Sequence, residues 1–199
     1  MTRTANPNHP IEIYDRLRRK SMKAKQVTTS AIMLSMLIVC SQISLPIGPI
    51  PITLQTLAIL LIGFLLPPKS TLVVTTLYVL GGLIGLPFFS GFVGGIQSVF
   101  LPSFGFIISF IAAAFFQAKY LSLFNNLKSK HYILSGLLNI GVTYLIGLSY
   151  MSFIFNVYLG NTISIKTLLL TGLLPFITGD ILKLTGSILI AKRLKNSLK

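Results

Sequence analysis

The chain consists of long runs of uncharged, mainly apolar residues separated by short segments that carry its charges. No charged residue occurs in the 43 positions between Lys25 and Lys69, in the 49 between Lys69 and Lys119, or in the 35 between Lys130 and Lys166. A membrane-spanning helix needs about 20 predominantly apolar residues. Each run is therefore long enough for at least one span, and the pattern predicts an all-α polytopic membrane protein.

Proline, glycine and charged residues divide these runs into six candidate spans. The predicted spans are about residues 27–46, 50–66, 70–86, 103–124, 132–156 and 167–191. They form one membrane domain, 27–191, between a basic tail, 1–26, and a basic end, 192–199. An even number of spans places both termini on the same side of the membrane. Within the tail, residues 11–25 fit either a short interfacial helix or a solvated basic arm.

The composition agrees with a membrane location. The chain is 53% hydrophobic and 10% charged, with a mean hydropathy of +0.82, whereas an average soluble domain is roughly 25% charged. Seventeen Lys and Arg face three acids, for a net charge of +14. With the N-terminus inside, fifteen of these seventeen lie on the inner side, as the positive-inside rule requires. We therefore expect a multi-pass membrane protein, with both termini cytoplasmic, anionic lipids as partners and no nucleic acid.

Two ionisable residues lie inside the sixth predicted span. Asp180 is twelve residues before Lys192, roughly 18 Å along a helix, and Lys183 follows three residues later on the same helical face. An ionised side chain at that depth costs about 2.5–3.5 kcal/mol on insertion scales, and such residues mark ligand or ion pathways. The alternative is structural: Asp180 and Lys183 neutralise each other and lock the helix, or Lys183 reaches the inner surface.

Glycine and phenylalanine are concentrated around the connection after the third span. Seven of the sixteen glycines lie here, near Phe88, Phe89 and Phe92; they are Gly81, Gly82, Gly85, Gly91, Gly94, Gly95 and Gly105. Such a loop can fold over a cavity as a lid, because glycine permits a close approach of the backbone and the rings cover a ring-shaped solute. The alternative is an ordinary re-entrant packing segment.

Two further features fit either a ligand or a neighbouring helix. Gln55 enters the second span just after Thr53, and a primary amide in lipid needs hydrogen-bond partners from a ligand or from another helix. In the first span, Ala31 and Ser35 form a small-xxx-small pair, which lets another helix approach closely. That helix belongs either to this chain or to a separate membrane subunit.

Residues suited to enzymatic chemistry are scattered along the chain. Cys40 is alone, and His9 and His131 lie at a different depth from Asp180, so no Ser/His pair or metal-ligand set is assembled. No P-loop for ATP is present in the sequence. We expect no enzymatic activity, no metal and no cofactor. A protein of this kind that concentrates a solute takes its energy from a partner or from a gradient.

Three ordered motifs resemble one known family. They are Gly48-Pro49-Ile50-Pro51-Ile52-Thr53-Leu54-Gln55-Thr56-Leu57, then Leu77-Tyr78 followed by Gly85-Leu86-Pro87-Phe88-Phe89, and then Pro175-Phe176 followed by Gly179-Asp180-Ile181-Leu182-Lys183. Together they resemble BioY, the biotin-specific substrate-capture subunit (S component) of energy-coupling factor (ECF) transporters. The resemblance extends over essentially the whole chain after residue 27.

The resemblance implies the ECF S-component fold of six helices, with a biotin cavity near the outer face that is covered by the first and third connections. It also implies a membrane scaffold (T component) and two cytoplasmic ATPases as partners, docked through Ala31 and Ser35. The implied function is capture of biotin from outside and its ATP-driven delivery inward. The alternatives are an S component for another vitamin, a secondary transporter with Asp180 as a proton site, and a membrane-embedded enzyme.

The resemblance also assigns residues to substrate binding. Asp180 and Lys183 match the family's Asp-x-x-Lys contacts, and a carboxylate that accepts from ureido N–H groups beside an ammonium suits biotin. The other residues predicted to bind are Thr53, Gln55, Tyr78, Phe89, Gly91, Phe92 and Ser103. No arginine occurs between Arg19 and Arg193. The valerate carboxylate of biotin is therefore left either to Lys183 or to water beside Gln97 and Ser98.

Overall fold

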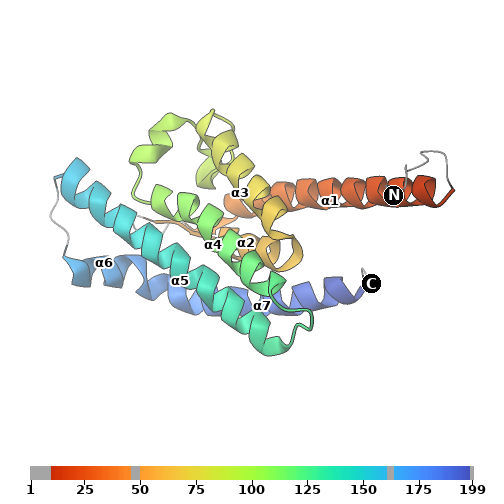
Figure 1. Ribbon diagram of the computed structural model, residues 1–199. Helices are drawn as coiled ribbons and strands as arrows, with labels where there is room; N and C mark the ends of the chain where they lie inside the picture. The colour runs from red at the N-terminus through yellow and green to blue at the C-terminus, as the bar shows by residue number, and fades with distance from the viewer. Residues whose placement is uncertain (1–9, 46–49, 161–163, 198–199) are drawn as a thin grey trace, which may run out of the picture.

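The chain is almost entirely helical. A computed structural model describes residues 10–45, 50–160 and 164–197. Within these ranges the elements are α1 (Pro10–Gln42), β1 (Ser44–Leu45), β2 (Ile52–Thr53), α2 (Gln55–Leu65), α3 (Pro68–Leu83), η1 (Ser90–Phe92), η2 (Ile96–Phe100), α4 (Phe104–Ser122), α5 (Ser129–Phe153), η3 (Ile154–Tyr158), α6 (Ile165–Gly172) and α7 (Leu174–Ser197) (Figure 1). The two short strands pair antiparallel, with Ser44 opposite Thr53.

Four helical segments in the described part of the chain are long and apolar enough to cross a membrane. They are residues Ala24–Gln42, Phe104–Ser122, Ser129–Tyr158 and Leu174–Lys195. They correspond to the first, fourth, fifth and sixth predicted spans. The second and third predicted spans, 50–66 and 70–86, correspond to the shorter helices α2 and α3, of 11 and 16 residues.

Two helix boundaries differ from the sequence prediction. Helix α1 begins at Pro10, so the backbone of residues 11–25 is helical and continues directly into the first predicted span. The sixth predicted span, 167–191, is divided, since α6 ends at Gly172 and α7 begins at Leu174. Pro175 occupies the first turn of α7, where a missing backbone N–H removes no helical hydrogen bond.

The connections gather at two ends of the molecule. The beginning of α1, the link from α4 to α5 and the last turns of α7 lie at one end, on the right in Figure 1. The segment with η1 and η2, the end of η3 and the beginning of α6 lie towards the other end. At the first end, Pro67 and Pro68 separate α2 from α3: Pro67 has an extended backbone, and Pro68 occupies the first turn of α3, where proline is well tolerated.

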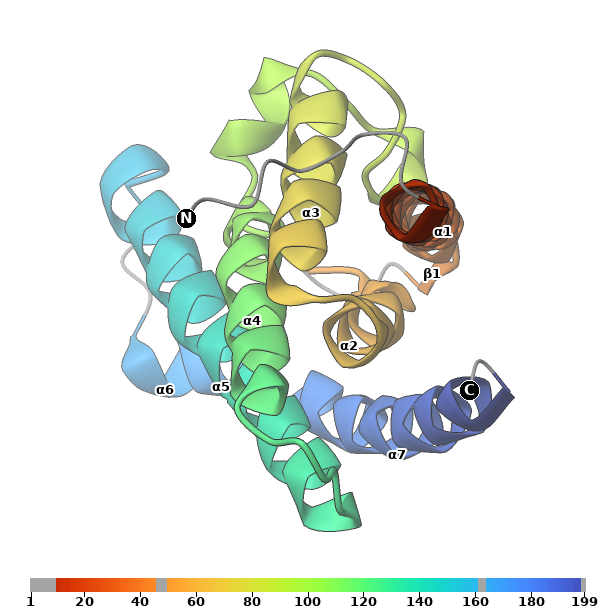
Figure 2. The same cartoon turned by 45° about the vertical axis from the view of Figure 1, so that its right-hand side comes forward.

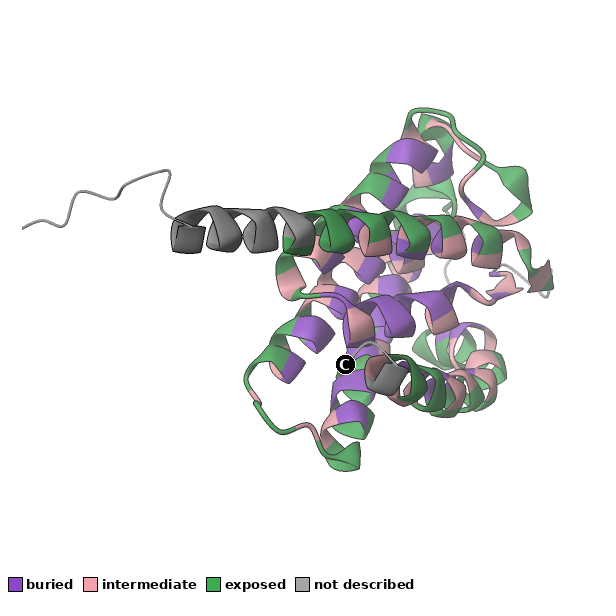
Figure 3. Ribbon diagram, turned by 90° about the vertical axis from the view of Figure 1, so that its right-hand side faces the viewer, coloured by how far each residue is buried: buried purple, intermediate pink, exposed green. Residues whose placement is uncertain are grey.

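Helix α2 is the centre of the packing. Every residue from Ala58 to Phe64 is buried, whereas α1 and α7 keep wide exposed faces (Figure 3). Figure 2 shows α2 between α1 and α3 on one side and α7 on the other. A short helix that is apolar all round belongs in the interior of a helical protein, and this position brings the N-terminal end of α2 next to α7.

Three helices are joined in the interior by side-chain amides. Gln117 of α4 has no exposed surface, and its Nε2 donates to the backbone oxygen of Leu60 in α2 over 3.1 Å. Asn139 of α5 donates its Nδ2 to Gln117 Oε1 over 2.7 Å. This pairing fits against the backbone of Gly63, where a Cβ atom would lie 2.2 Å from Gln117 Oε1. We call Leu60, Gly63, Gln117 and Asn139 the amide clasp.

The amide clasp predicts that Gly63→Ala destabilises the protein, although alanine is normally the better helix former. The added methyl group must displace the Gln117 amide, and this displacement breaks its hydrogen bonds with Leu60 and Asn139. Leaving a buried amide unsatisfied costs about 1–3 kcal/mol, so the midpoint of thermal unfolding in detergent should fall.

Gly141→Ala is the matched control, because no atom lies within 4 Å of its added Cβ. This substitution should leave the unfolding midpoint unchanged or raise it, since alanine gains about 0.5–1 kcal/mol over glycine within a helix. Equal midpoints for the two variants would contradict the structural role of the amide clasp.

Candidate substrate-binding cavity

A cavity of about 270 Å³ lies among α2, α4, α5, α7 and the connection from α3 to α4. This volume is near the lower end of the range for small-molecule sites, about 300–1,000 Å³. The polar residues of its wall are Thr53, Gln55, Thr56, Ser90, Ser98, Ser103, Thr143, Tyr144, Asp180 and Lys183. The apolar part of the wall includes the rings of Phe89, Phe106, Phe110 and Phe176. An apolar wall with a few convergent polar groups is typical of a site for a small organic ligand.

The two ionised residues of the wall form a buried ion pair. Lys183 Nζ lies 3.1 Å from Asp180 Oδ1, and the two side chains are only 12% and 7% exposed. Thr56 donates to the same Asp180 oxygen over 3.0 Å and accepts from Lys183 over 2.9 Å. Tyr144 donates to Asp180 Oδ2 over 2.6 Å. Both ions are thus paired and hydrogen-bonded, which is the condition under which charges are tolerated in an interior.

Thr56, Tyr144, Asp180 and Lys183 form what we call the ion-pair cluster. Its two charged members keep hydrogen-bonding groups that no atom of the described residues uses. An ionised carboxylate has about four lone-pair sites, and Asp180 uses three of them, for Thr56, Lys183 and Tyr144. One site remains, on Oδ2. The Lys183 ammonium has three N–H groups, and two of them are used within the cluster. The Asp180–Lys183 pair can therefore accept one hydrogen bond and donate one while its own bonds stay intact.

A second group of polar residues fixes the beginning of α2. Thr53 donates to Gln55 Oε1 over 2.8 Å, and Gln55 Nε2 donates to the hydroxyl of Tyr78 over 2.5 Å. Tyr78 in turn donates to the backbone oxygen of Phe88 over 3.0 Å and has no exposed surface. Thr53 and Gln55 lie on the cavity wall, whereas Tyr78 lies behind it and holds Gln55 in place.

The end of α1 holds the segment Pro87–Val93, which we call the cover segment because Phe89, Ser90 and Val93 form part of the cavity wall. Ser41 of α1 donates to the backbone oxygen of Phe88. The Gln42 amide donates to the backbone oxygen of Phe89 over 3.2 Å and accepts from the backbone N–H of Phe92 over 2.9 Å. The backbone of the cover segment is thus tied to a transmembrane helix through side-chain hydrogen bonds.

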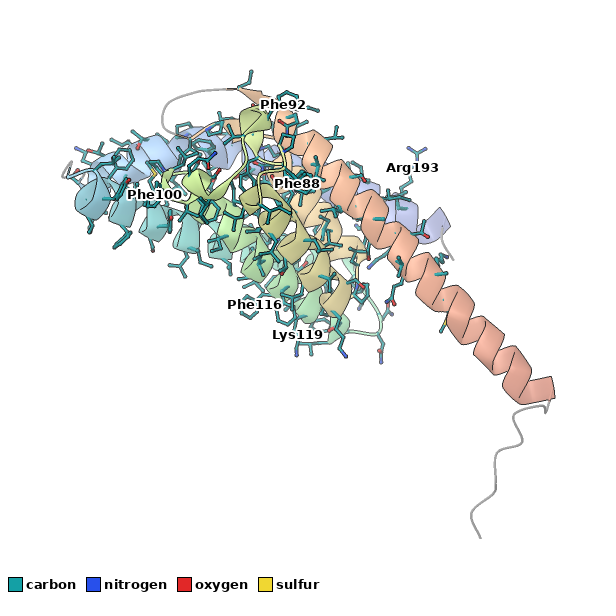
Figure 4. The ribbon with its side chains drawn as sticks, turned by 90° about the horizontal axis from the view of Figure 1, so that it is seen from above. Phe88, Phe92, Phe100, Phe116, Lys119 and Arg193 are labelled. Carbon is teal, nitrogen blue, oxygen red and sulfur yellow. The ribbon has the colours of Figure 1, made fainter. Side chains whose placement is uncertain are left out.

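The rings of the cover segment lie in different places. Phe89 is 2% exposed and makes edge-to-face contacts with Tyr78 and Phe104. Phe88 stacks on Tyr78 with ring centroids 6.2 Å apart. Phe92 is 71% exposed and lies on the outer edge of the molecule beside the end of α1 (Figure 4). Only Phe89 among these three rings lines the cavity.

Most of the binding residues predicted from the sequence come together at this cavity. Six lie on its wall: Thr53, Gln55, Phe89, Ser103, Asp180 and Lys183. Tyr78, Gly91 and Phe92 lie outside the wall; Gly91 is an exposed residue of η1 with a positive φ of 75°. Asp180, Lys183 and Gln55 each make the internal contact that one alternative expected and also lie on the cavity wall, and their contact with a ligand stays a prediction.

Sequence reasoning missed the residues that complete the ion-pair cluster. Thr56 and Tyr144 are 124 and 36 positions away from Asp180. A signal for α5 was available, because Ser135, Asn139 and Thr143 recur every four residues and all face the interior. Polar residues at that spacing share one helical face, and Tyr144 lies at its edge.

The predicted docking pair lies on the surface of α1. Ala31 and Ser35 are both exposed, and Ser35 Oγ donates to the backbone oxygen of Ala31 over 3.0 Å. Their close spacing therefore does not serve packing against another described helix of this chain. Across the three described ranges, no three His, Cys, Asp or Glu side chains are grouped as a metal site.

The hydrogen bonds from α1 predict that Gln42→Ala loosens the cover segment. Removing the amide eliminates its contacts with the backbone oxygens of Pro87, Phe88 and Phe89 and with one backbone N–H. At about 0.5–1.5 kcal/mol for each bond, opening of the segment should become at least tenfold more frequent. Hydrogen–deuterium exchange of the backbone amides of residues 87–93 measures how often the cover segment opens. Gln97→Ala is the control, because that amide donates to Gly94 within the same connection. Unchanged exchange in Gln42→Ala would show that the hydrogen bonds from α1 do not hold the cover segment.

Comparison with known proteins identifies the family. The model described as the BioY family matches residues 16–199. The probable biotin transporter BioY of Pyrococcus horikoshii is 34% identical over 88% of this chain and 99% of the relative. The biotin transporter BioY of Thermotoga maritima is 35% identical over 86% and 96%. A crystal structure at 2.1 Å of the S-component for biotin from an ECF-type ABC transporter covers 88% of this chain and 93% of its own, with 29% identity and a TM-score of 0.79. These matches confirm the resemblance seen in the sequence motifs: the chain belongs to the BioY family.

Proposed function

We propose that this chain is the biotin-binding S component of an ECF transporter, a subunit that captures biotin in an outward-facing cavity and delivers it inward with an ATP-driven module. The observation that carries the proposal is the Asp180–Lys183 pair on the wall of a cavity of about 270 Å³. The names of the relatives, which are those of biotin transporters, support it, as does the likeness to a crystallised S-component for biotin. These names also favour transport over an enzymatic reaction.

The cavity suits the chemistry of biotin. The free lone-pair site on Asp180 accepts one ureido N–H, and the free N–H of Lys183 donates to the ureido oxygen beside it. Hydrogen bonds to ionised groups are roughly twice as strong as those between neutral groups. Phe89, Phe106 and Phe176 on the wall cover the apolar faces of the bicyclic ring system, so that one end of the ligand is polar and its body is apolar.

The proposed membrane arrangement has six spans, with α2 and α3 as the short second and third spans and both termini in the cytoplasm. The helix ends that gather on the right in Figure 1 carry most of the basic residues, including Lys69, Lys119 and Arg193. Under the positive-inside rule this end faces the cytoplasm of the bacterial cell, where the basic residues also contact anionic lipids. The cover segment then faces outward.

The proposed energy source is a partner complex of a T component and cytoplasmic ATPases. The sequence has no P-loop of its own. The exposed small residues Ala31 and Ser35 form a strip on α1 that a helix of the T component can approach closely. The same strip leaves the cavity wall untouched, so docking and substrate binding use different faces of the subunit.

Asp180→Asn is expected to weaken equilibrium binding of labelled biotin to the purified protein by about 10- to 100-fold, the value of one hydrogen bond to a charged group. Because this variant leaves Lys183 buried without its counter-ion, the double variant Asp180→Asn/Lys183→Met is measured alongside it. Replacing both members of a buried pair is often neutral for stability, so the double variant should fold and still bind poorly. Wild-type affinity in the folded double variant would overturn the assignment of the site.

Ser35→Leu is expected to leave biotin binding within about twofold of wild type. It should reduce biotin uptake into cells that contain the partner proteins by at least about tenfold, because a bulky residue blocks close helix packing. Ser149→Leu is the matched control, because Ser149 is an exposed helical serine with the same hydrogen bond to the residue four positions earlier. Reduced uptake in both variants would argue against a specific docking strip. Uptake that collapses with an uncoupler at constant ATP would instead favour a proton-coupled transporter.

A further inference from the structure

Two hydroxyl groups on the cavity wall have no hydrogen-bond partner. Ser98 Oγ and Thr143 Oγ1 are both unpaired, although the residues are only 1% and 4% exposed. A buried polar group that stays unpaired costs about 1–3 kcal/mol. Other buried hydroxyls in this protein avoid the cost by bonding to a carbonyl of their own helix, as Ser109, Thr75 and Ser187 do. Ser98 and Thr143 instead face the cavity.

The two hydroxyls come from different elements of the cavity wall, α5 and η2. Thr143 precedes Tyr144 on α5, and Tyr144 bonds directly to Asp180. Ser98 belongs to η2, in the same connection as the cover segment. Figures 1 and 2 place this connection and α7 on opposite sides of α4. One unpaired hydroxyl is therefore next in sequence to a residue of the ion-pair cluster, and the other belongs to the connection that carries the cover segment.

The two charged side chains of the cavity wall are already engaged with each other. The wall has one acid and one base, and these are bonded to each other. Lys183 Nζ is held at Asp180 and Thr56, so its remaining N–H serves the same end of the cavity. Gln97 is exposed, donates its amide to Gly94 and is not among the residues of the wall. Among the described residues of the wall, the polar side chains other than Asp180 and Lys183 are neutral.

We propose that Ser98 and Thr143 contact the ligand at its two polar ends. Thr143 accepts the ureido N–H for which Asp180 has no free lone pair, and Ser98 donates to the carboxylate of the side chain. This inference rests on the proposed function, because biotin supplies both groups. It implies that the protein binds the carboxylate of biotin with a neutral hydroxyl, without a dedicated cation, and therefore discriminates weakly against ligands whose carboxylate is replaced by an uncharged polar group.

The experiment crosses two variants with two ligands. Ser98→Ala and Thr143→Val, each of which removes only a hydroxyl or replaces it by a methyl, are titrated with biotin and with biotinol, in which a primary alcohol replaces the carboxylate. Ser98→Ala should weaken biotin binding by about tenfold and biotinol binding by less than about threefold, because a hydrogen bond to an ionised acceptor is worth more than a neutral one. Thr143→Val should weaken both ligands equally, by about three- to tenfold.

Ser109→Ala and Thr75→Val are the controls, since both hydroxyls are fully buried, bonded within their own helices and absent from the cavity wall. Their affinities should match wild type. Wild-type affinity for biotin in Ser98→Ala and Thr143→Val would overturn the inference and leave the proposed function standing. An equal loss for biotin and biotinol in Ser98→Ala would overturn the assignment of Ser98 to the carboxylate. No binding of biotin by the wild-type protein would overturn the proposed function itself.

Discussion

The buried ion pair of Asp180 and Lys183 is the interaction on which the rest of the site depends. Two charges in the interior are tolerated only when they are paired and their remaining hydrogen-bonding groups are satisfied. Here Thr56 of α2 and Tyr144 of α5 donate hydrogen bonds to the Asp180 carboxylate of α7. Satisfying this buried charge therefore holds α2, α5 and α7 in fixed relative positions. Asp180 and Lys183 also keep one acceptor site and one donor site unused, and these can match one N–H group and the oxygen of a cyclic urea.

The short helix α2 makes this arrangement possible. It is buried along most of its length, and its polar residues are confined to the beginning, where Gln55 and Thr56 reach the cavity. From Gln55 a continuous set of hydrogen bonds runs through Tyr78 to the backbone of Phe88, and from there to Ser41 on α1. The helix that carries the exposed pair Ala31 and Ser35 is thus connected to the segment that covers the cavity.

The sequence predicted the parts of this structure that follow from local rules. Uncharged runs predicted a membrane protein, and the cost of burying charge singled out Asp180 and Lys183, which lie on the cavity wall. The contacts from Thr56 and Tyr144 were not predictable, because they depend on how α2, α5 and α7 pack, and no spacing along the chain encodes that packing. Gly91 and Phe92 were expected at the ligand from the composition of their loop. The hydrogen bond from Phe92 N to Gln42 instead holds this part of the loop beside the end of α1, outside the wall.

The role of the ion pair is tested most directly by an experimental structure of the protein with biotin bound. The ion-pair cluster predicts that one ureido nitrogen lies about 2.7–3.1 Å from the Asp180 carboxylate, with the ureido oxygen within hydrogen-bond distance of Lys183 Nζ. A structure in which biotin occupies the cavity with its ureido ring away from both residues, while Asp180 and Lys183 bond only to protein groups, would contradict that role.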